Sequence, residues 1–234
     1  MQLSRRPTLA PPTDLSRGLS ACAAALGQRP AVTVLRPQGR QEQGFVTLAQ
    51  WAAKGAHLLQ TDAFLTPGDV VFVDMPPSWQ LASVCAAVWW AGGTVATDGP
   101  AGAVAAVVHE LRAPPSDVEV CFVVGDAVDG GTTVASTLPA WTDESALFPD
   151  APPACAATAD GAALRTADGT LTHAEVIEAV SGQTDVLGLD VGDLTGSGVL
   201  EVAARPVVVG RATVVLATGT PRSDADGDAV GHWA

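Results

Sequence analysis

The stretch that decides the fold is TPGDVVFVDMPPS, residues 66–78. Its centre, residues 70–73, is a short apolar run typical of a buried parallel strand, with turn residues before it and prolines after it. Ser78 can then cap an alanine-rich helix that ends at Gly92-Gly93, and residues 94–97 form the next short apolar run. This strand–helix–strand order predicts a βαβ unit with a right-handed crossover.

The same kind of pattern continues on both sides of this unit. Asp14 or Ser16 can begin a helix that ends at Gly27, and Thr47 can cap another that carries an apolar stripe. Further elements are expected as a strand at 31–36, a return strand starting at Phe45-Val46 to complete a hairpin, an Ala/Val helix ending near Leu111, and a strand at 118–124. The sequence therefore predicts an α/β protein with a layered, doubly wound and mostly parallel sheet.

Four segments follow from changes in composition. Residues 1–125 are expected to form a first α/β subdomain, and residues 126–153, rich in Gly, Thr, Asp and Pro, to form a linker with one helical turn near 141–147. Residues 154–222 are expected to form a second, smaller α/β part, with apolar runs at 162–164 and 212–217, a helix from Thr172 to about Val180 and a helix around Val199. Residues 223–234 read as an acidic tail.

Composition excludes several classes of protein. The formal net charge of −13 argues against binding to nucleic acid, which needs clustered basic residues. The four cysteines form no C-x-x-C pair, which argues against a zinc ribbon and favours buried, reduced thiols. The uncharged stretch 75–97 is broken by prolines and by Gly92-Gly93, so a helix and a strand fit it better than a membrane span. With no signal-peptide pattern, a cytoplasmic location is expected.

Three pieces in order resemble the opening of the adenylate-forming superfamily, which includes acyl-CoA synthetases and the adenylation domains of peptide synthetases. TLAQW at 47–51 is similar to the family's T-Y-A-E-L, and residues 66–78 are similar to its V-x-P-G-D-R-V-A-L-L-L-P-N-S. The stretch VWWAGGTVATDGP at 88–100 is similar to L-K-A-G-A-V-Y-V-P-L-D-P. The match covers roughly residues 14–125, and it implies a layered α/β structure like the family's N-terminal region.

The resemblance also implies a candidate nucleotide site. In the family, a Ser/Thr/Gly-rich phosphate loop ending in Pro-Lys-Gly precedes a Thr-His pair that opens a helix. Residues 157–161 stand where that loop is expected, so the resemblance points to Thr158, Gly161, Thr172 and His173 as cofactor-binding residues. No lysine is present there, and Asp160 and Asp168 would repel phosphate. A rival alignment takes residues 171–176 as a partial repeat of the helix start at Thr47; alternatively, Thr172 simply caps its helix.

No complete catalytic site is predicted. Adenylation needs positive charge around the phosphates, but the chain has one lysine, Lys54, and lacks the family's adenine- and ribose-binding motifs and C-terminal catalytic domain. The four histidines show no metal-binding spacing, so neither a metal site nor a catalytic residue is expected. The leading hypothesis is a non-catalytic AMP-binding-like domain with no obligatory cofactor, which retains residual binding of ATP, AMP or CoA or binds a partner protein. The alternatives are an enzyme of another class, with its site between the two α/β parts, and a homodimeric assembly module.

Overall fold

The computed structural model describes residues 9–36, 39–125, 131–155, 157–181, 188–190 and 199–216. Within these ranges the helices are α1 (Leu15–Leu26), α2 (Phe45–Asp62), α3 (Trp79–Trp90), α4 (Trp141–Ala146), α5 (His173–Ser181), the π-helix η2 (Val199–Ala204) and α6 (Arg205–Val209). The strands are β1 (Pro30–Arg36), β2 (Gly39–Gly44), β3 (Val70–Asp74), β4 (Thr94–Ala96), β5 (Ala103–His109), β6 (Val120–Val124), β7 (Ala162–Thr166), β8 (Gly169–Thr172), β9 (Gly188–Asp190) and β10 (Thr213–Leu216). The predicted tail, 223–234, lies outside the described residues.

The larger sheet has six strands in the order β6-β5-β3-β4-β7-β8. All its pairings are parallel except that of β7 with β8, which form an antiparallel hairpin at one edge. After β3 the chain runs through α3 to β4 on one side and then returns across β3 to β5 on the other side. The structure thus confirms the predicted α/β fold with a mostly parallel sheet.

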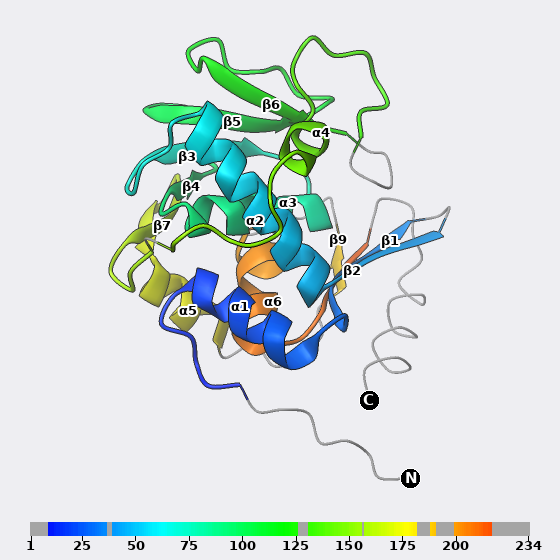
Figure 1. The fold of residues 1–234 in the computed structure, drawn as a ribbon, viewed down its shortest axis with the longest axis vertical. Helices are drawn as coiled ribbons and strands as arrows, with labels where there is room; N and C mark the ends of the chain where they lie inside the picture. The colour runs from blue at the N-terminus through cyan, green and yellow to red at the C-terminus, as the bar shows by residue number, and fades with distance from the viewer. Residues whose placement is uncertain are drawn as a thin grey trace.

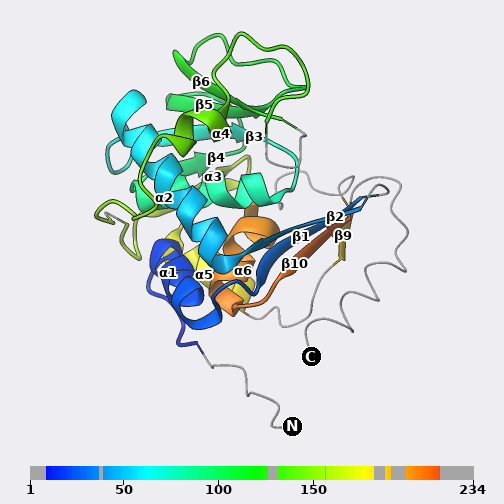
Figure 2. The same ribbon diagram turned by 45° about the vertical axis from the view of Figure 1, so that its right-hand side comes forward.

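The smaller sheet has four strands in the order β2-β1-β10-β9. β1 pairs antiparallel with β2 and parallel with β10, so the last described strand lies beside the first. Figure 2 shows this sheet extending away from the helices. Both sheets contain strands from each of the two predicted α/β parts, because β7 and β8 join the larger sheet and β1 and β2 join the smaller one.

One large core cluster holds the sheets and helices together, and a second, smaller one lies on β5 and β6. α3 is buried at every position, including Trp89 and Trp90, since it packs against α2, η2 and α1. In Figure 1, α2 and α3 lie over the larger sheet, whereas α1, α5 and α6 gather beyond its β7 end. α6 contacts both α1 and α5, so the start of the chain and the second α/β part form one packed layer.

The ends of α1 and the start of α3 follow the sequence closely, whereas the predicted cap Thr47 is wrong, because α2 begins at Phe45 after Gly44. Asp14 caps α1 by accepting a hydrogen bond from the Arg17 backbone N–H at 2.9 Å, and Gly27 ends the helix at φ +62°. Ser78 caps α3 by accepting from the Leu81 backbone N–H at 3.1 Å. These three predicted helix signals are confirmed because each depends only on neighbouring residues.

Two predicted elements are wrong. Phe45 and Val46 begin α2 instead of forming a return strand, and the hairpin partner of β1 is the polar segment β2, whose cross-strand neighbours fix it as an edge strand. The expected Ala/Val helix before Leu111 is strand β5, which lies between β3 and β6. Alanine favours helices locally, but Gly102 at φ +72° and parallel neighbours on both sides place this run in the sheet.

The predicted linker is held against α2 where it is described. The Nζ of Lys54 lies 2.8 Å from a carboxylate oxygen of Asp150 and donates to the Phe148 carbonyl at 2.9 Å. His57 contacts the Ala151 carbonyl at 2.9 Å, and its ring stacks on Phe148. Lys54, which lies on α2 and not on α5, is therefore bound to the linker.

The cysteine thiols form no disulfides, and Cys22 instead donates to the Val207 carbonyl at 3.3 Å. Three of the four cysteines are buried. Burial raises the pKa of Cys22 to about 12, which keeps this thiol protonated at neutral pH. Among the helices that the structure describes, none is both long and apolar enough to cross a membrane.

Candidate functional site

The start of α5 is the centre of the candidate site. Thr172 is the residue before the helix, and its hydroxyl accepts from the Glu175 backbone N–H at 3.2 Å. In return, one oxygen of the Glu175 carboxylate accepts from the Thr172 backbone N–H at 2.8 Å and from its hydroxyl at 3.0 Å. This reciprocal arrangement is a capping box, in which the chain itself satisfies the donors at the helix start.

The Thr158–Gly161 turn closes the same helix start from the other side. The Gly161 backbone N–H donates to the Thr158 carbonyl at 3.0 Å, which folds these residues into a tight turn before β7. The carbonyls of Gly161 and Ala159 then accept from the backbone N–H groups of His173 and Ala174, both at 3.0 Å. Three successive N–H donors at the start of α5 are therefore bound to acceptors of the chain.

No Gly-rich loop lies directly before the Thr-His pair. Thr172 ends β8, and β8 is joined to β7 by a turn formed by Ala167 and Asp168 alone. Thr166 closes this turn, its hydroxyl oxygen accepting from the Asp168 backbone N–H at 3.3 Å. The turn residues are exposed, and Asp168 places a carboxylate there.

His173 is buried at the first position of α5, with 1% of its surface exposed. Its Nδ1 accepts from the Leu15 backbone N–H at 3.4 Å, and its ring packs against Trp89 in a T-shaped arrangement, with ring centroids 6.4 Å apart. Burial lowers the pKa of His173, and the nearby carboxylate of Asp14 opposes that shift. The imidazole is thus a neutral hydrogen-bond acceptor inside the protein.

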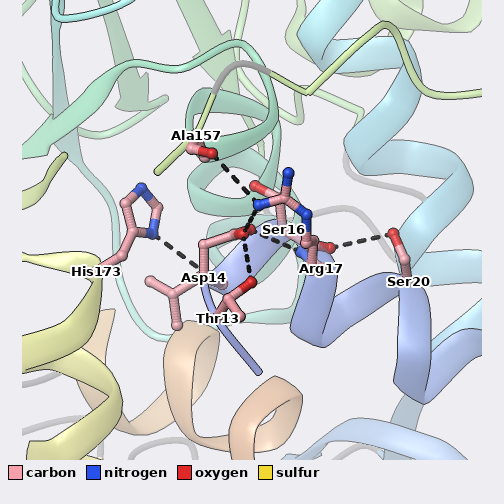
Figure 3. A network of polar contacts seen from close by, with 8 residues as sticks. Thr13, Asp14, Ser16, Arg17, Ser20, Ala157 and His173 are labelled. Atoms are coloured by element: carbon pink, nitrogen blue, oxygen red, sulfur yellow. Dashed lines mark hydrogen bonds and ion pairs between the residues drawn. The ribbon is translucent and has the colours of Figure 1, made fainter. Parts of the chain in front are cut away.

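Asp14 and Arg17 complete the polar cluster around His173, as Figure 3 shows. Asp14 is fully buried and forms an ion pair with the guanidinium of Arg17. The Arg17 guanidinium also lies 3.5 Å from the Ala157 carbonyl, which connects α1 to the segment before the Thr158–Gly161 turn. Hydrogen bonding and charge attraction from Asp14 raise the pKa of Arg17.

The four residues implied by the family resemblance therefore lie close together, and the hydrogen bonds described above join them to one another or to nearby residues of the chain. Thr158 and Gly161 lie in the turn, and Thr172 and His173 lie at the helix start that this turn contacts. Thr172 has the capping role that the sequence allowed. Their role in binding a cofactor stays a prediction.

Asp14 and Arg17 were missed as members of this cluster, because their contacts with Ala157 and with the His173 region join segments about 140 to 160 residues apart. The Thr172-x-x-Glu175 spacing was present in the sequence as a capping-box signal.

The two helix starts compared in the rival alignment share a backbone arrangement, but in a different register. The N–H groups of Phe45 and Val46, the first residues of α2, donate to the carbonyls of Arg29 and Gly27 at 3.0 Å. His173 and Ala174 bind Gly161 and Ala159 in the same arrangement. In each unit a strand starts directly after the first acceptor, β1 after Arg29 and β7 after Gly161. These equivalent hydrogen bonds align Phe45 with His173. That register differs by three residues from the sequence alignment of Thr47 with Thr172.

Comparison with solved structures places this geometry in a known fold. The chain is similar to an acyl-CoA synthetase of Brucella canis, with a TM-score of 0.67 and 15% identity over 91% of this chain and 44% of that one. A long-chain-fatty-acid-CoA ligase of Archaeoglobus fulgidus gives 0.69 and 17%, over 95% of this chain and 50% of that one. The chain has the fold of the N-terminal half of acyl-CoA synthetases.

That finding confirms the predicted resemblance as one of fold. The chain also matches the nonribosomal peptide synthetase FmoA3, with a TM-score of 0.62 and 19% identity over 92% of this chain and 24% of that one. The chain thus spans half or less of the length of these structures.

A sequence relative comes from Mycobacterium tuberculosis. It is a TIGR03089 family protein, 34% identical over 88 residues, which are 37% of this chain and 36% of the relative. Because these two shares are nearly equal, the two chains have nearly the same length. No family model matches the chain.

The described residues offer no cluster of three or more His, Cys, Asp or Glu side chains that could hold a metal ion. Within the candidate site, the Asp14–Arg17 pair and Glu175 are engaged with other groups of the chain, and Asp160 and Asp168 add carboxylates in the two neighbouring turns.

Proposed function

We propose that this chain is a non-catalytic AMP-binding-like domain that binds a protein partner. The observation that carries the proposal is the start of α5, where the N–H groups of His173, Ala174 and Glu175 are all bound to acceptors of the chain. A helix start binds phosphate through such N–H groups, so a phosphate there would have to displace intrachain bonds. Glu175 adds a carboxylate at the position that an anion would take.

The charge around this site also opposes adenylation. Joining a carboxylate to ATP brings anions together, and it needs cationic groups near the phosphorus and the leaving group. The only lysine of the sequence, Lys54 on α2, is paired with Asp150, and Arg17 is paired with the buried Asp14. Asp160 and Asp168 bring further negative charge to the two turns beside the helix start.

An exposed aromatic residue supports the choice of a protein as the partner. Phe64 follows the end of α2 with 79% of its surface exposed, and its φ of +51° lies in the left-handed region. A bulky residue pays a conformational cost in this region, where glycine is the usual residue. Both features destabilise the isolated domain. Burial of the Phe64 ring against another protein would remove the unfavourable exposure of its apolar surface to water.

The catalytic half of the proposal is tested with ligands and turnover. We expect no shift of the unfolding midpoint with ATP, AMP, coenzyme A or a short acyl-CoA, with or without magnesium, and no acid-dependent exchange of pyrophosphate into ATP. A ligand at a hundredfold its dissociation constant would stabilise the chain by about 2.7 kcal/mol, which is readily measured. Stabilisation by an adenine nucleotide that is lost in Thr172→Ala, or pyrophosphate exchange by the chain, would overturn the proposal.

The partner half is tested by comparing two exposed apolar residues. Sedimentation over a wide range of concentrations detects a homodimer, and quantitative affinity enrichment from cells of the source organism detects another protein. We expect Phe64→Ser to reduce the association at least tenfold. Leu147 is equally exposed, so Leu147→Ser is the matched control and should leave the association unchanged. Equal effects of the two substitutions would exclude Phe64 as the contact, and a monomer that enriches no protein would contradict partner binding.

A further inference from the structure

Three segments that are distant in the sequence meet at the start of α1. Leu15 donates its backbone N–H to Nδ1 of His173, and Arg17 reaches the Ala157 carbonyl while paired with Asp14. Figure 3 shows His173 and Arg17 on opposite sides of Asp14. The start of α1 is thereby connected to the start of α5 and to the segment before the Thr158–Gly161 turn.

The contact between His173 and Leu15 exists in one protonation state only. Nδ1 of the imidazole accepts a hydrogen bond, so it must carry a lone pair and no proton. Adding a proton would place an N–H group against the Leu15 N–H, and both would be donors. It would also create a positive charge at a residue with 1% of its surface exposed, next to the buried carboxylate of Asp14.

We propose that Asp14, Arg17 and His173 form a proton-operated latch that holds the start of α1 against the start of α5. At neutral pH the latch is closed through the Leu15 N–H and the Arg17–Asp14 pair. When His173 takes up a proton, its imidazolium is attracted to Asp14 and competes with Arg17 for the carboxylate. The Leu15 hydrogen bond is then lost, and the contact between Arg17 and the Ala157 carbonyl weakens.

Other charged groups near α5 do not replace Asp14 in this role. β7, η2 and α6 pack against α5 and carry Arg165, Glu201 and Arg205. The charged group that acts on His173 is Asp14, with Arg17 behind it as its ion-pair partner. Glu175, on α5 itself, is turned to the Thr172 cap. Trp89 of α3 contributes an aromatic ring and no charge.

The test is amide hydrogen exchange of the full chain between pH 7.5 and pH 5.0, corrected for the intrinsic pH dependence of exchange. We expect protection of the Leu15 amide to fall by up to about 30-fold, the factor by which an imidazole with the ordinary pKa of 6.5 favours its protonated form at pH 5.0. His173→Asn keeps an acceptor near the position of Nδ1 and cannot take up the proton. In this variant the protection should stay constant over the same range.

Two further measurements keep the outcome decisive. His57→Asn removes a histidine that contacts the linker instead of α1, and this control should keep the pH dependence of the parent chain. If His173→Asn does not fold, the imidazole of His173 is titrated by nuclear magnetic resonance in the parent chain. Constant protection of Leu15 while His173 becomes protonated, or an unchanged pH dependence in His173→Asn, would overturn the proposal.

Discussion

The two hairpin–helix units of the chain, β1–β2–α2 and β7–β8–α5, start their helices with the same backbone bonds but fill the same position with different chemistry. In both, the first two helical N–H groups donate to carbonyls of the turn before the hairpin. Phe45 and His173, the first residues of the two helices, are both 1% exposed. One unit closes its helix start with an apolar ring, and the other with a titratable ring.

A second difference concerns the residue before each helix. Gly44 precedes α2 without a side-chain cap, whereas Thr172 precedes α5 within a capping box. A Cβ at Gly44 would lie 2.7 Å from the Gln28 carbonyl oxygen, so a cap like Thr172 does not fit there. The comparison teaches that the same backbone arrangement can be stabilised by close packing in one unit and by polar contacts in the other.

The largest expected effect is the loss of the apolar ring in the first unit. Phe45→Ala should lower the free energy of unfolding by about 3–5 kcal/mol, because it removes a fully buried aromatic side chain and leaves a cavity. Urea unfolding measures this, and the loss should be the same at pH 7.5 and pH 5.0. A loss below about 1 kcal/mol would show that the start of α2 does not depend on the ring.

The next effect tests why the first unit has no cap. Gly44→Ala should lower the free energy of unfolding by about 1–3 kcal/mol, because the new methyl group meets the backbone of Gln28 and forces a shift. Thermal unfolding is a sufficient measurement, with Gly39→Ala, where a Cβ meets open space but φ is +146°, as the comparison for backbone strain alone. Gly44 itself has φ −77°, which alanine adopts without strain, so an unchanged midpoint in Gly44→Ala would contradict the proposed contact with Gln28.

The third effect is the pH dependence that the second unit introduces. Burial lowers the pKa of His173 in the folded chain, so the unfolded chain binds this proton more readily. The contribution to stability is complete above pH 6.5 and is lost as the pH falls below it, by at most about 2 kcal/mol at pH 5.0. His173→Phe, which copies the first unit, should remove this part of the pH dependence in urea titrations. An identical slope in both chains would contradict the assignment.

The smallest effect concerns the cap of the second unit. Thr172→Ala should lower the free energy of unfolding by about 1 kcal/mol, the usual effect of losing a helix cap. Thr172→Ser keeps the hydroxyl and should restore most of it, which differential scanning calorimetry can resolve. If Ser and Ala behave alike, the Thr172 hydroxyl is not what holds the start of α5.

Prediction from sequence succeeded where neighbouring residues decide the structure. Asp14 and Gly27 mark the ends of α1, and Ser78 the start of α3, since each acts within one helical turn. Prediction failed at Phe45-Val46 and at the alanine-rich β5, where local preference conflicts with the sheet. For the candidate site, the sequence supplied Thr172 and His173, but Leu15 and Ala157 lie too far away in the chain for any pattern to connect them.

By itself, the sequence determined an α/β fold like the opening of adenylate-forming enzymes, the caps of α1 and α3 and the lack of lysine near the candidate loop. Those features depend on residue type and short spacing. The tertiary structure alone decided that both sheets take strands from both parts of the chain, and that His173 faces the start of α1. The physical reason is that a buried polar group must find a partner wherever the packing brings one, and the packing joins residues that the sequence keeps apart.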